Sequence, residues 1–184
     1  YREQFPEFLI LWVMSGSGIY KSYPDAPEVC REIVESYPHV GIMLVGDKLC
    51  RILASDTLYE HPRIYDKCDI PKLRTTLLMT KYADLVVSPD TGILHAAGCF
   101  KTPKIVLYGH SMHENISKHF YNVIPIQSPA FCSPCCRLVP IEDYIYMCKP
   151  DRESHASLCM REIKKETVMD AVNSVVKGTA VYAS

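Results

Sequence analysis

The residues with the clearest chemical potential are Asp90, Thr91 and Gly92, with His95 three positions further on. They follow an apolar run, residues 83–87, that is typical of a buried strand, and they open a segment with helical composition. A strand that turns directly into a helix leaves backbone N–H groups without intrahelical partners, and these groups and the helix dipole attract phosphate. The pattern predicts a diphosphate-binding turn, with the Thr91 hydroxyl and His95 as additional donors and Gly92 permitting close approach. The simpler alternative is that Asp90 or Thr91 only caps a helix and that His95 is a packed residue.

A second candidate loop, residues 15–21, is rich in glycine and follows the apolar run at residues 8–14. It departs from the G-x-G-x-x-G dinucleotide fingerprint because position 21 is Lys, and it lacks the Gly-Lys-Ser/Thr of a Walker A loop. Nicotinamide cofactors and P-loop chemistry are therefore disfavoured. We expect the Lys21 ammonium to neutralise a leaving diphosphate, with Ser17 donating beside it. The alternative is that Lys21 is a solvated surface charge.

The loop at residues 108–114 also follows a strand-like run. His110 and His113 have a spacing that suggests a metal, but His113-Glu114 lacks the second histidine of a zincin motif. We therefore interpret both histidines as polar loop groups, and Ser111 as a further candidate contact to phosphate.

Nine cysteines are many for a chain of 184 residues. An odd number of cysteines without a secretory signal favours a reducing compartment. Four lie in apolar or amphipathic segments and are predicted to be small core residues, namely Cys30, Cys50, Cys68 and Cys99. Four thiolates in a later region could hold zinc tetrahedrally and fix a long loop, namely Cys132, Cys135, Cys148 and Cys159. The alternatives are reduced thiols packed inside that loop, or one disulfide.

Charge and length exclude several classes of protein. With 20 basic and 21 acidic side chains and no basic tract, the chain offers no electrostatic case for binding nucleic acid or a membrane surface. It has neither a run of about 18 apolar residues nor the architecture of a signal peptide. A chain of 184 residues can build one sizeable core, so we predict one domain over residues 1–184. The lack of an initiator Met indicates a piece of something longer.

Strand-like and helix-like segments alternate along the chain. Apolar runs predict strands at residues 8–14, 40–45, 63–65, 85–87, 104–108 and 122–126. Amphipathic patterns predict helices at residues 27–37, 48–54, 72–82, 114–119 and 162–176. The alternation predicts an α/β fold with a doubly wound, Rossmann-like parallel sheet. In that architecture ligands bind outside the carboxyl ends of the strands, where the loops at 15–22 and 88–92 both lie.

Two further expectations concern packing. The helix at 72–82 is predicted to bury Leu73, Leu77 and either Leu78 or Met79. The cysteine-rich loop, at about residues 127–160, shows little periodicity, and loops of that length are usually functional, disordered or clamped.

Residues 87–97, which read V-S-P-D-T-G-I-L-H-A-A, resemble the Asp-Thr/Ser-Gly-x-x-His signature of family 9 glycosyltransferases, the ADP-heptose:lipopolysaccharide heptosyltransferases and their relatives. Residues 104–109 are similar to the strand before the family's Phe/Tyr-Gly loop. Residues 18–24 resemble its lysine and Trp/Tyr-Pro after the first strand, and Cys132-Ser-Pro-Cys135 with residues 159–163 is similar to a cysteine pattern of many members. The resemblance extends from about residue 8 to residue 177.

The resemblance implies the C-terminal, donor-binding half of a GT-B enzyme, with Asp90, Thr91, Gly92 and His95 around the donor diphosphate and Ser17 and Lys21 across the cleft. Such enzymes are inverting and metal-independent, and no cofactor is required. The general base and the acceptor site would belong to an N-terminal domain that this sequence lacks, so the domain alone is expected to be inactive. Two departures are His110, where Pro is common, and Val45-Gly46-Asp47, which lacks the family's usual acidic helix start of Gly-Gly-Pro-x-Glu.

The function implied is transfer of a heptose-like sugar from a nucleotide-diphospho-sugar, with an ADP-sugar favoured, to lipopolysaccharide or another glycan. This implies an enzyme that is located in the cytoplasm, with peripheral attachment to the inner membrane as the alternative location. The alternatives are a non-catalytic nucleotide-sugar-binding module, a zinc-stabilised interaction domain, and a nucleotide-sugar epimerase of the same architecture. The epimerase is disfavoured because the Cys159-Met160 pattern favours the transferases.

Overall fold

The computed structural model describes residues 4–55, 60–69, 72–136, 148, 150–151 and 156–183. Six strands form one sheet in the order β3-β2-β1-β4-β5-β6, and every neighbouring pair is parallel. The strands are β1 (Phe8–Val13), β2 (Val40–Val45), β3 (Ile64–Asp66), β4 (Leu85–Pro89), β5 (Lys104–Tyr108) and β6 (Val123–Gln127). The α/β doubly wound class expected from the sequence is therefore confirmed, together with all six of the expected strands.

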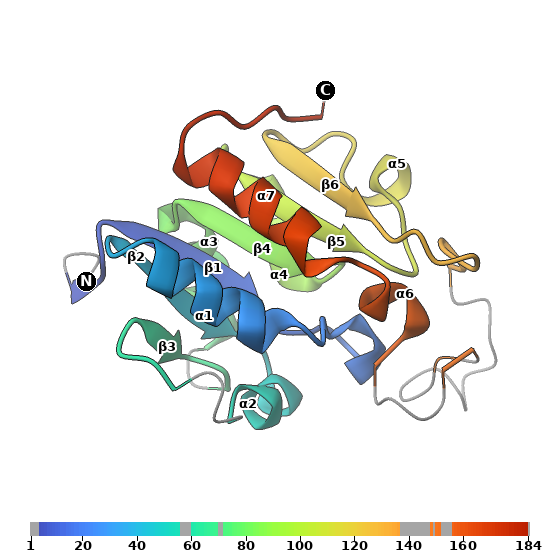
Figure 1. Cartoon of the computed structure of the whole chain (residues 1–184), viewed down its shortest axis with the longest axis horizontal. Coiled ribbons are helices and arrows are strands. Elements are labelled where there is room, and N and C mark those ends of the chain that lie inside the picture. The colour runs from blue at the N-terminus through green and yellow to red at the C-terminus, as the bar shows by residue number, and fades with distance from the viewer. Residues whose placement is uncertain are drawn as a thin grey trace.

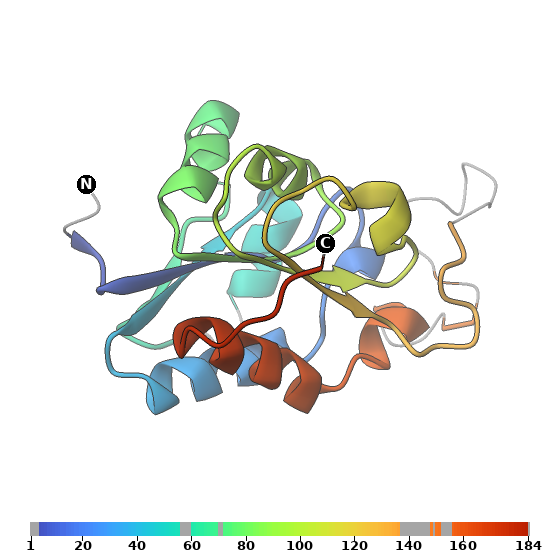
Figure 2. The same ribbon diagram turned by 90° about the horizontal axis from the view of Figure 1, so that it is seen from above.

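Helices cover both faces of the sheet. In Figure 2, α1 and α7 lie on one face, and α3, α4 and α5 lie on the other. The helical segments are η2 (Ile19–Lys21), α1 (Ala26–Ser36), α2 (Lys48–Ala54), α3 (Leu73–Tyr82), α4 (Gly92–Gly98), α5 (His113–Ile116), α6 (Leu158–Arg161) and α7 (Lys165–Val176). Figure 1 shows α1 and α7 lying side by side across the strands. In the part of the chain that is described, no helix is long and apolar enough to span a bilayer.

The main core lies between the sheet and the α1–α7 face. Ile10 and Trp12 of β1 pack there with Ile33 of α1 and Val172 of α7, and all four are essentially fully buried. Strands covered on both faces are apolar at most positions, and β2 is buried along its whole length. Burying side chains of this size provides most of the free energy that holds such a sheet together.

Helix α3 packs differently from its apolar pattern. The side chains it buries are Thr76 and Thr80, whereas Leu73 is 72% exposed and Leu78 is 48% exposed. The Thr80 hydroxyl donates to the carbonyl of Leu77, which makes its burial acceptable because the polar group is paired within the helix. Of the expected apolar residues, only Met79 packs against the core on this face. The prediction for Leu73 was wrong because helical periodicity does not show which side of a helix meets the sheet.

Two smaller corrections concern the ends of helices. Cys99 follows the last residue of α4 and is exposed, so it is not a core residue, whereas Cys30, Cys50 and Cys68 are buried as expected. The terminal helix α7 begins at Lys165 rather than at residue 162, because a separate short turn, α6, precedes it.

Candidate functional site

A crevice opens at the carboxyl edge of the sheet, where strand order reverses between β1 and β4. Such a reversal is the place where parallel α/β sheets bind ligands. The crevice has a volume of about 570 Å³, within the range of small-molecule sites. Its walls include the loop after β1 and the turn after β4, together with residues from the ends of β2 and β3 and from α3: Ser15, Gly16, Ser17, Gly46, Asp47, Asp69, Leu73, Thr76, Leu77, Thr91, Gly92 and Ile93.

The turn after β4 is held by Thr91. Its Oγ1 accepts the N–H of Leu94 at 3.1 Å and lies 3.2 Å from Ser88 Oγ. Ser88 donates its own proton to the carbonyl of Pro89, so Thr91 is the donor in the hydroxyl pair. Thr91 therefore caps α4, as the simpler interpretation of the sequence had it, and its hydroxyl is used within the turn.

Gly92 leaves the corner after the turn open. A Cβ atom built on Gly92 would meet no atom within 4 Å among the described residues. The first intrahelical bond of α4 runs from the N–H of His95 to the carbonyl of Thr91, so the N–H groups of Gly92 and Ile93 precede the helical ladder. Both residues line the crevice, which provides room for a ligand beside their backbone.

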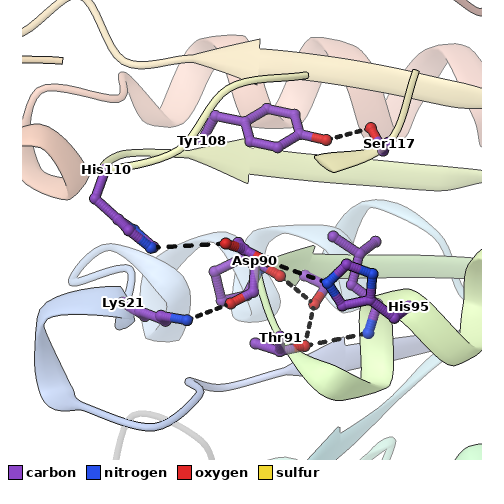
Figure 3. A network of polar contacts seen from close by, with 10 residues as sticks. Lys21, Asp90, Thr91, His95, Tyr108, His110 and Ser117 are labelled. Atoms are coloured by element: carbon purple, nitrogen blue, oxygen red, sulfur yellow. Dashed lines mark hydrogen bonds and ion pairs between the residues drawn. The ribbon is translucent and has the colours of Figure 1, made fainter. Parts of the chain in front are cut away.

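The loop after β1 meets this turn through Lys21. The Lys21 ammonium, carried by η2, donates to the carbonyl of Asp90 at 2.7 Å (Figure 3). Gly16, in the loop after β1, packs closely against the turn after β4. A Cβ at this position would come within 3.0 Å of Lys21 Cδ and within 3.1 Å of Thr91 Cγ2. The two loops predicted to form one site are therefore in contact, although 69 residues separate Lys21 from Asp90.

The carboxylate of Asp90 lies between two histidines. His95 Nε2 is 3.5 Å from Asp90 Oδ1, and His110 Nε2 is 3.6 Å from Asp90 Oδ2 (Figure 3). The edge of the His110 ring also meets the ring of Tyr20, with centroids 5.3 Å apart. We did not identify His110 as a site residue from the sequence. Its place in the loop after β5, the third loop at this edge of the sheet, is the signal that could have found it.

Two of the expected phosphate contacts have different surroundings. Ser17 is exposed and lines the crevice, as expected for a donor. Ser111 is 7% exposed and does not line the crevice, and its hydroxyl has no hydrogen-bond partner among the described residues. Of the expected site residues, Ser17, Thr91 and Gly92 line the crevice. Lys21 and His95 contact Asp90 at the turn beside it, and Ser111 follows His110 in the loop after β5.

The four cysteines of the expected metal site are free thiols. Burial raises the pKa of Cys159, and the nearby thiols of Cys148, Cys135 and Cys132 raise it further. Cys159 Sγ also lies 3.2 Å from Ser157 Oγ. Within the described ranges, however, no group of three or more His, Cys, Asp or Glu side chains is arranged to hold a metal ion. Much of the loop itself, residues 137–147, 149 and 152–155, lies outside the described residues.

Comparison with known proteins identifies one family. Residues 70–144 match the model of glycosyltransferase family 9 (heptosyltransferase). No curated protein matches the chain.

Several solved structures share the fold. Escherichia coli ADP-heptose lipopolysaccharide heptosyltransferase II is 15% identical with a TM-score of 0.68, over 94% of this chain and 48% of that one. The dodecameric, iron-containing heptosyltransferase TibC of enterotoxigenic E. coli, in complex with ADP-D-β-D-heptose, is 12% identical with a TM-score of 0.69, over 93% and 46%. A UDP-N-acetylglucosamine 2-epimerase from Listeria monocytogenes has a TM-score of 0.52 at 17% identity, over 92% and 37%. The chain thus spans less than half of each of these proteins.

Proposed function

We propose that this chain binds the nucleotide-diphospho-sugar donor of a sugar-transfer reaction, since residues 70–144 match the model of glycosyltransferase family 9 and the chain shares the fold of heptosyltransferases. The observation that carries this proposal is the open crevice at the reversal of strand order, which joins the Ser15–Ser17 loop to the turn at Thr91 and Gly92. The donor diphosphate would lie at that turn, beside Lys21.

The charges around the crevice support this placement. Lys21, His95 and His110 gather on the side of the Asp90 turn, where a diphosphate needs cationic and N–H donors. Asp47 and Asp69 line the crevice elsewhere, and carboxylates are acceptors suited to the hydroxyl groups of a ribose or a sugar. A ligand with an anionic centre and hydroxyl-rich ends matches this division of charge.

The chemical contribution of the site is to stabilise the leaving group. When the bond between the sugar and the diphosphate breaks, negative charge builds on the departing nucleoside diphosphate. An ammonium held at the turn stabilises that charge more strongly in the transition state than in the bound donor, and this lowers the barrier. We assign this role to Lys21, whose position is fixed by the carbonyl of Asp90.

The identity of the substrates is proposed from the relatives. TibC was solved with ADP-D-β-D-heptose, which supports an ADP-sugar with a heptose-like group as the donor. The acceptor is proposed to be lipopolysaccharide or another glycan, and the place of action the cytoplasm. The general base and the acceptor site are proposed to lie in a second domain. A longer form of the protein that transferred no sugar from ADP-heptose would favour the non-catalytic module instead.

Calorimetric titration of the parent protein and a K21A variant with ADP, UDP, GDP and CDP tests the donor site. We expect ADP to bind most tightly, and K21A to weaken binding by roughly tenfold to a hundredfold, the value of one charge-assisted hydrogen bond. K101A is the matched control, since Lys101 is an exposed lysine just before β5, at the amino edge of the sheet. Equal affinities of K21A and the parent protein would refute the role of Lys21.

We also propose that Cys132, Cys135, Cys148 and Cys159 bind a structural metal. Four free thiols suit zinc or iron by their chemistry, and after burial the thiols of Cys148, Cys135 and Cys132 are causes of the raised pKa of Cys159. One protein with the same fold, TibC, contains iron. Such a metal would anchor the loop and α6 and would leave the donor site unchanged.

Metal analysis of the purified protein tests this second proposal. About one equivalent of zinc or iron is expected in the parent protein, with loss in a C132S/C135S variant. The control is C99S, which changes an exposed cysteine next to α4. A parent protein with well under one equivalent of both metals would end the proposal.

A further inference from the structure

We propose that His110 is a positioning residue of the donor site, which together with His95 neutralises the Asp90 carboxylate so that the turn accepts a diphosphate. This inference rests on the proposed donor function. It adds His110 to the donor site and couples donor binding to the uptake of a proton.

The geometry places one carboxylate between two imidazoles from different elements. His95 belongs to α4 and His110 to the loop after β5, and each places its Nε2 within 3.6 Å of a different oxygen of Asp90 (Figure 3). The side chains of Asp90 and His110 are only 15% and 17% exposed, whereas that of His95 is 53% exposed. The carboxylate is therefore enclosed by the two rings, and water screens it little.

An ionised Asp90 alone would oppose the proposed ligand. Its carboxylate belongs to the same turn as Gly92, where the diphosphate would lie, and two anions this close in a half-buried corner repel each other. Protonated imidazoles on both carboxylate oxygens cancel this charge and keep the carboxylate directed away from the crevice. The corner then presents cationic groups to an incoming anion.

His110 is held in place for this role. Its ring edge meets Tyr20 of η2, and its carbonyl accepts the N–H of Cys136 at 2.8 Å. Other titratable or charged groups around this loop, among the described residues, include Lys21 of η2, whose ammonium lies 5.8 Å from the Tyr20 ring centre, and Cys159 of α6. Tyr108 of β5, His113 and Glu114 of α5, and Cys136 also lie around it. The thiol of Cys159 lies behind Gly109, where a Cβ would come within 2.7 Å of it.

Histidine is the side chain whose ordinary pKa lies between pH 5 and 8. A bound diphosphate favours the protonated form of both rings, so binding and protonation strengthen each other by the same factor. The affinity for a diphosphate should therefore rise as the pH falls through the histidine range. This dependence should require His110, because loss of its ring leaves one carboxylate oxygen without a counter-charge.

The test is calorimetric titration of the protein with ADP at pH 6 and pH 8, for the parent protein and for H110Q. Any titration of ADP itself is common to both proteins and cancels in the comparison. We expect H110Q to lose about fivefold to tenfold in affinity at pH 6, and less at pH 8, above the ordinary pKa of a histidine. H39Q is the matched control, since His39 is an exposed histidine just before β2, at the opposite edge of the sheet.

A second measurement counts protons and does not depend on the absolute affinity. Titrations of the parent protein in two buffers of different ionisation enthalpy give the number of protons taken up on binding, and H110Q should take up fewer. If K21A weakens ADP binding but H110Q matches the parent at both pH values, the inference about His110 is wrong and the donor function stands. If the parent protein binds no nucleoside diphosphate at either pH, the proposed donor function is wrong, and the inference about His110 is wrong as well.

Discussion

Two lysines at opposite edges of the sheet show how one kind of side chain serves different ends. At the amino edge, Lys104 is fully buried, and its ammonium donates to the carbonyls of Phe100, Thr102 and Tyr121 at 2.8, 2.6 and 2.9 Å. An ammonium has three protons, so Lys104 is saturated by the chain itself. At the carboxyl edge, Lys21 is only partly buried, and its ammonium donates to the carbonyl of Asp90 at the turn whose next two residues, Thr91 and Gly92, line an open crevice.

The difference shows what separates a structural cation from a binding one. Lys104 ties the α4–β5 connection to Tyr121, two residues before β6. Its charge is enclosed there, and burial lowers its pKa to about 8. Lys21 holds the Asp90 turn while remaining next to the space where a ligand would lie. Stability should therefore depend on Lys104, and ligand binding on Lys21.

The largest effect on the free energy of unfolding is expected from replacing Lys104. K104M leaves three backbone carbonyls without their shared donor, and we expect a loss of about 3–5 kcal/mol in the free energy of unfolding. The measurement is urea-induced unfolding followed by circular dichroism, with K101M as the exposed control. ADP affinity, measured where K104M is still folded, should stay near the parent value. A K104M protein as stable as K101M would show that the three hydrogen bonds contribute nothing.

A smaller effect on the free energy of unfolding is expected from raising the pH, because several thiols are buried in the folded protein. Burial raises the pKa of Cys50 to about 12 and raises those of Cys68 and Cys30 as well. A group whose pKa is higher in the folded state stabilises the protein below its unfolded pKa, about 8.5 for cysteine, and that stability is lost as the pH rises further. The lowered pKa of Lys104 acts with the opposite sign between about pH 8 and its unfolded pKa, about 10.4, but it is one group against three.

The free energy of unfolding should therefore fall by about 2–4 kcal/mol between pH 8 and pH 10. Urea denaturation at intervals across this range measures the slope. C68A should have a flatter slope than the parent protein, whereas C99S, which changes an exposed cysteine, should leave it unchanged. A slope that rises with pH in the parent protein would mean that Lys104 outweighs the thiols.

The smallest effects should come from two glycines at the ends of α4. An alanine at Gly98 would bring its Cβ within 2.7 Å of the Phe120 ring, so G98A should lose about 1–3 kcal/mol of stability. An alanine at Gly92 meets open space, so G92A should fold with the stability of the parent protein to within about 1 kcal/mol. Its methyl group enters the corner beside the proposed diphosphate, so ADP binding should weaken in G92A. Unchanged ADP affinity in G92A would place the diphosphate elsewhere.

The sequence supplied the elements and part of the site. Mostly apolar runs identified the six strands, because a strand covered on both faces has few polar positions. The same reasoning failed for α3, where Thr76 and Thr80 are buried and Leu73 is exposed. A threonine can satisfy its hydroxyl within its own helix, so its polarity does not reveal which side of the helix is buried.

By itself, the sequence determined that a strand ends in Asp90-Thr91-Gly92 and that Lys21 follows another strand, since both follow from local patterns of residues. Only the tertiary structure decided that the Lys21 ammonium reaches the carbonyl of Asp90 and that His110 reaches its carboxylate. These contacts join segments 69 and 20 residues apart. Their proximity comes from the order of strands in the sheet and from the helical crossovers that connect them, which local periodicity does not encode.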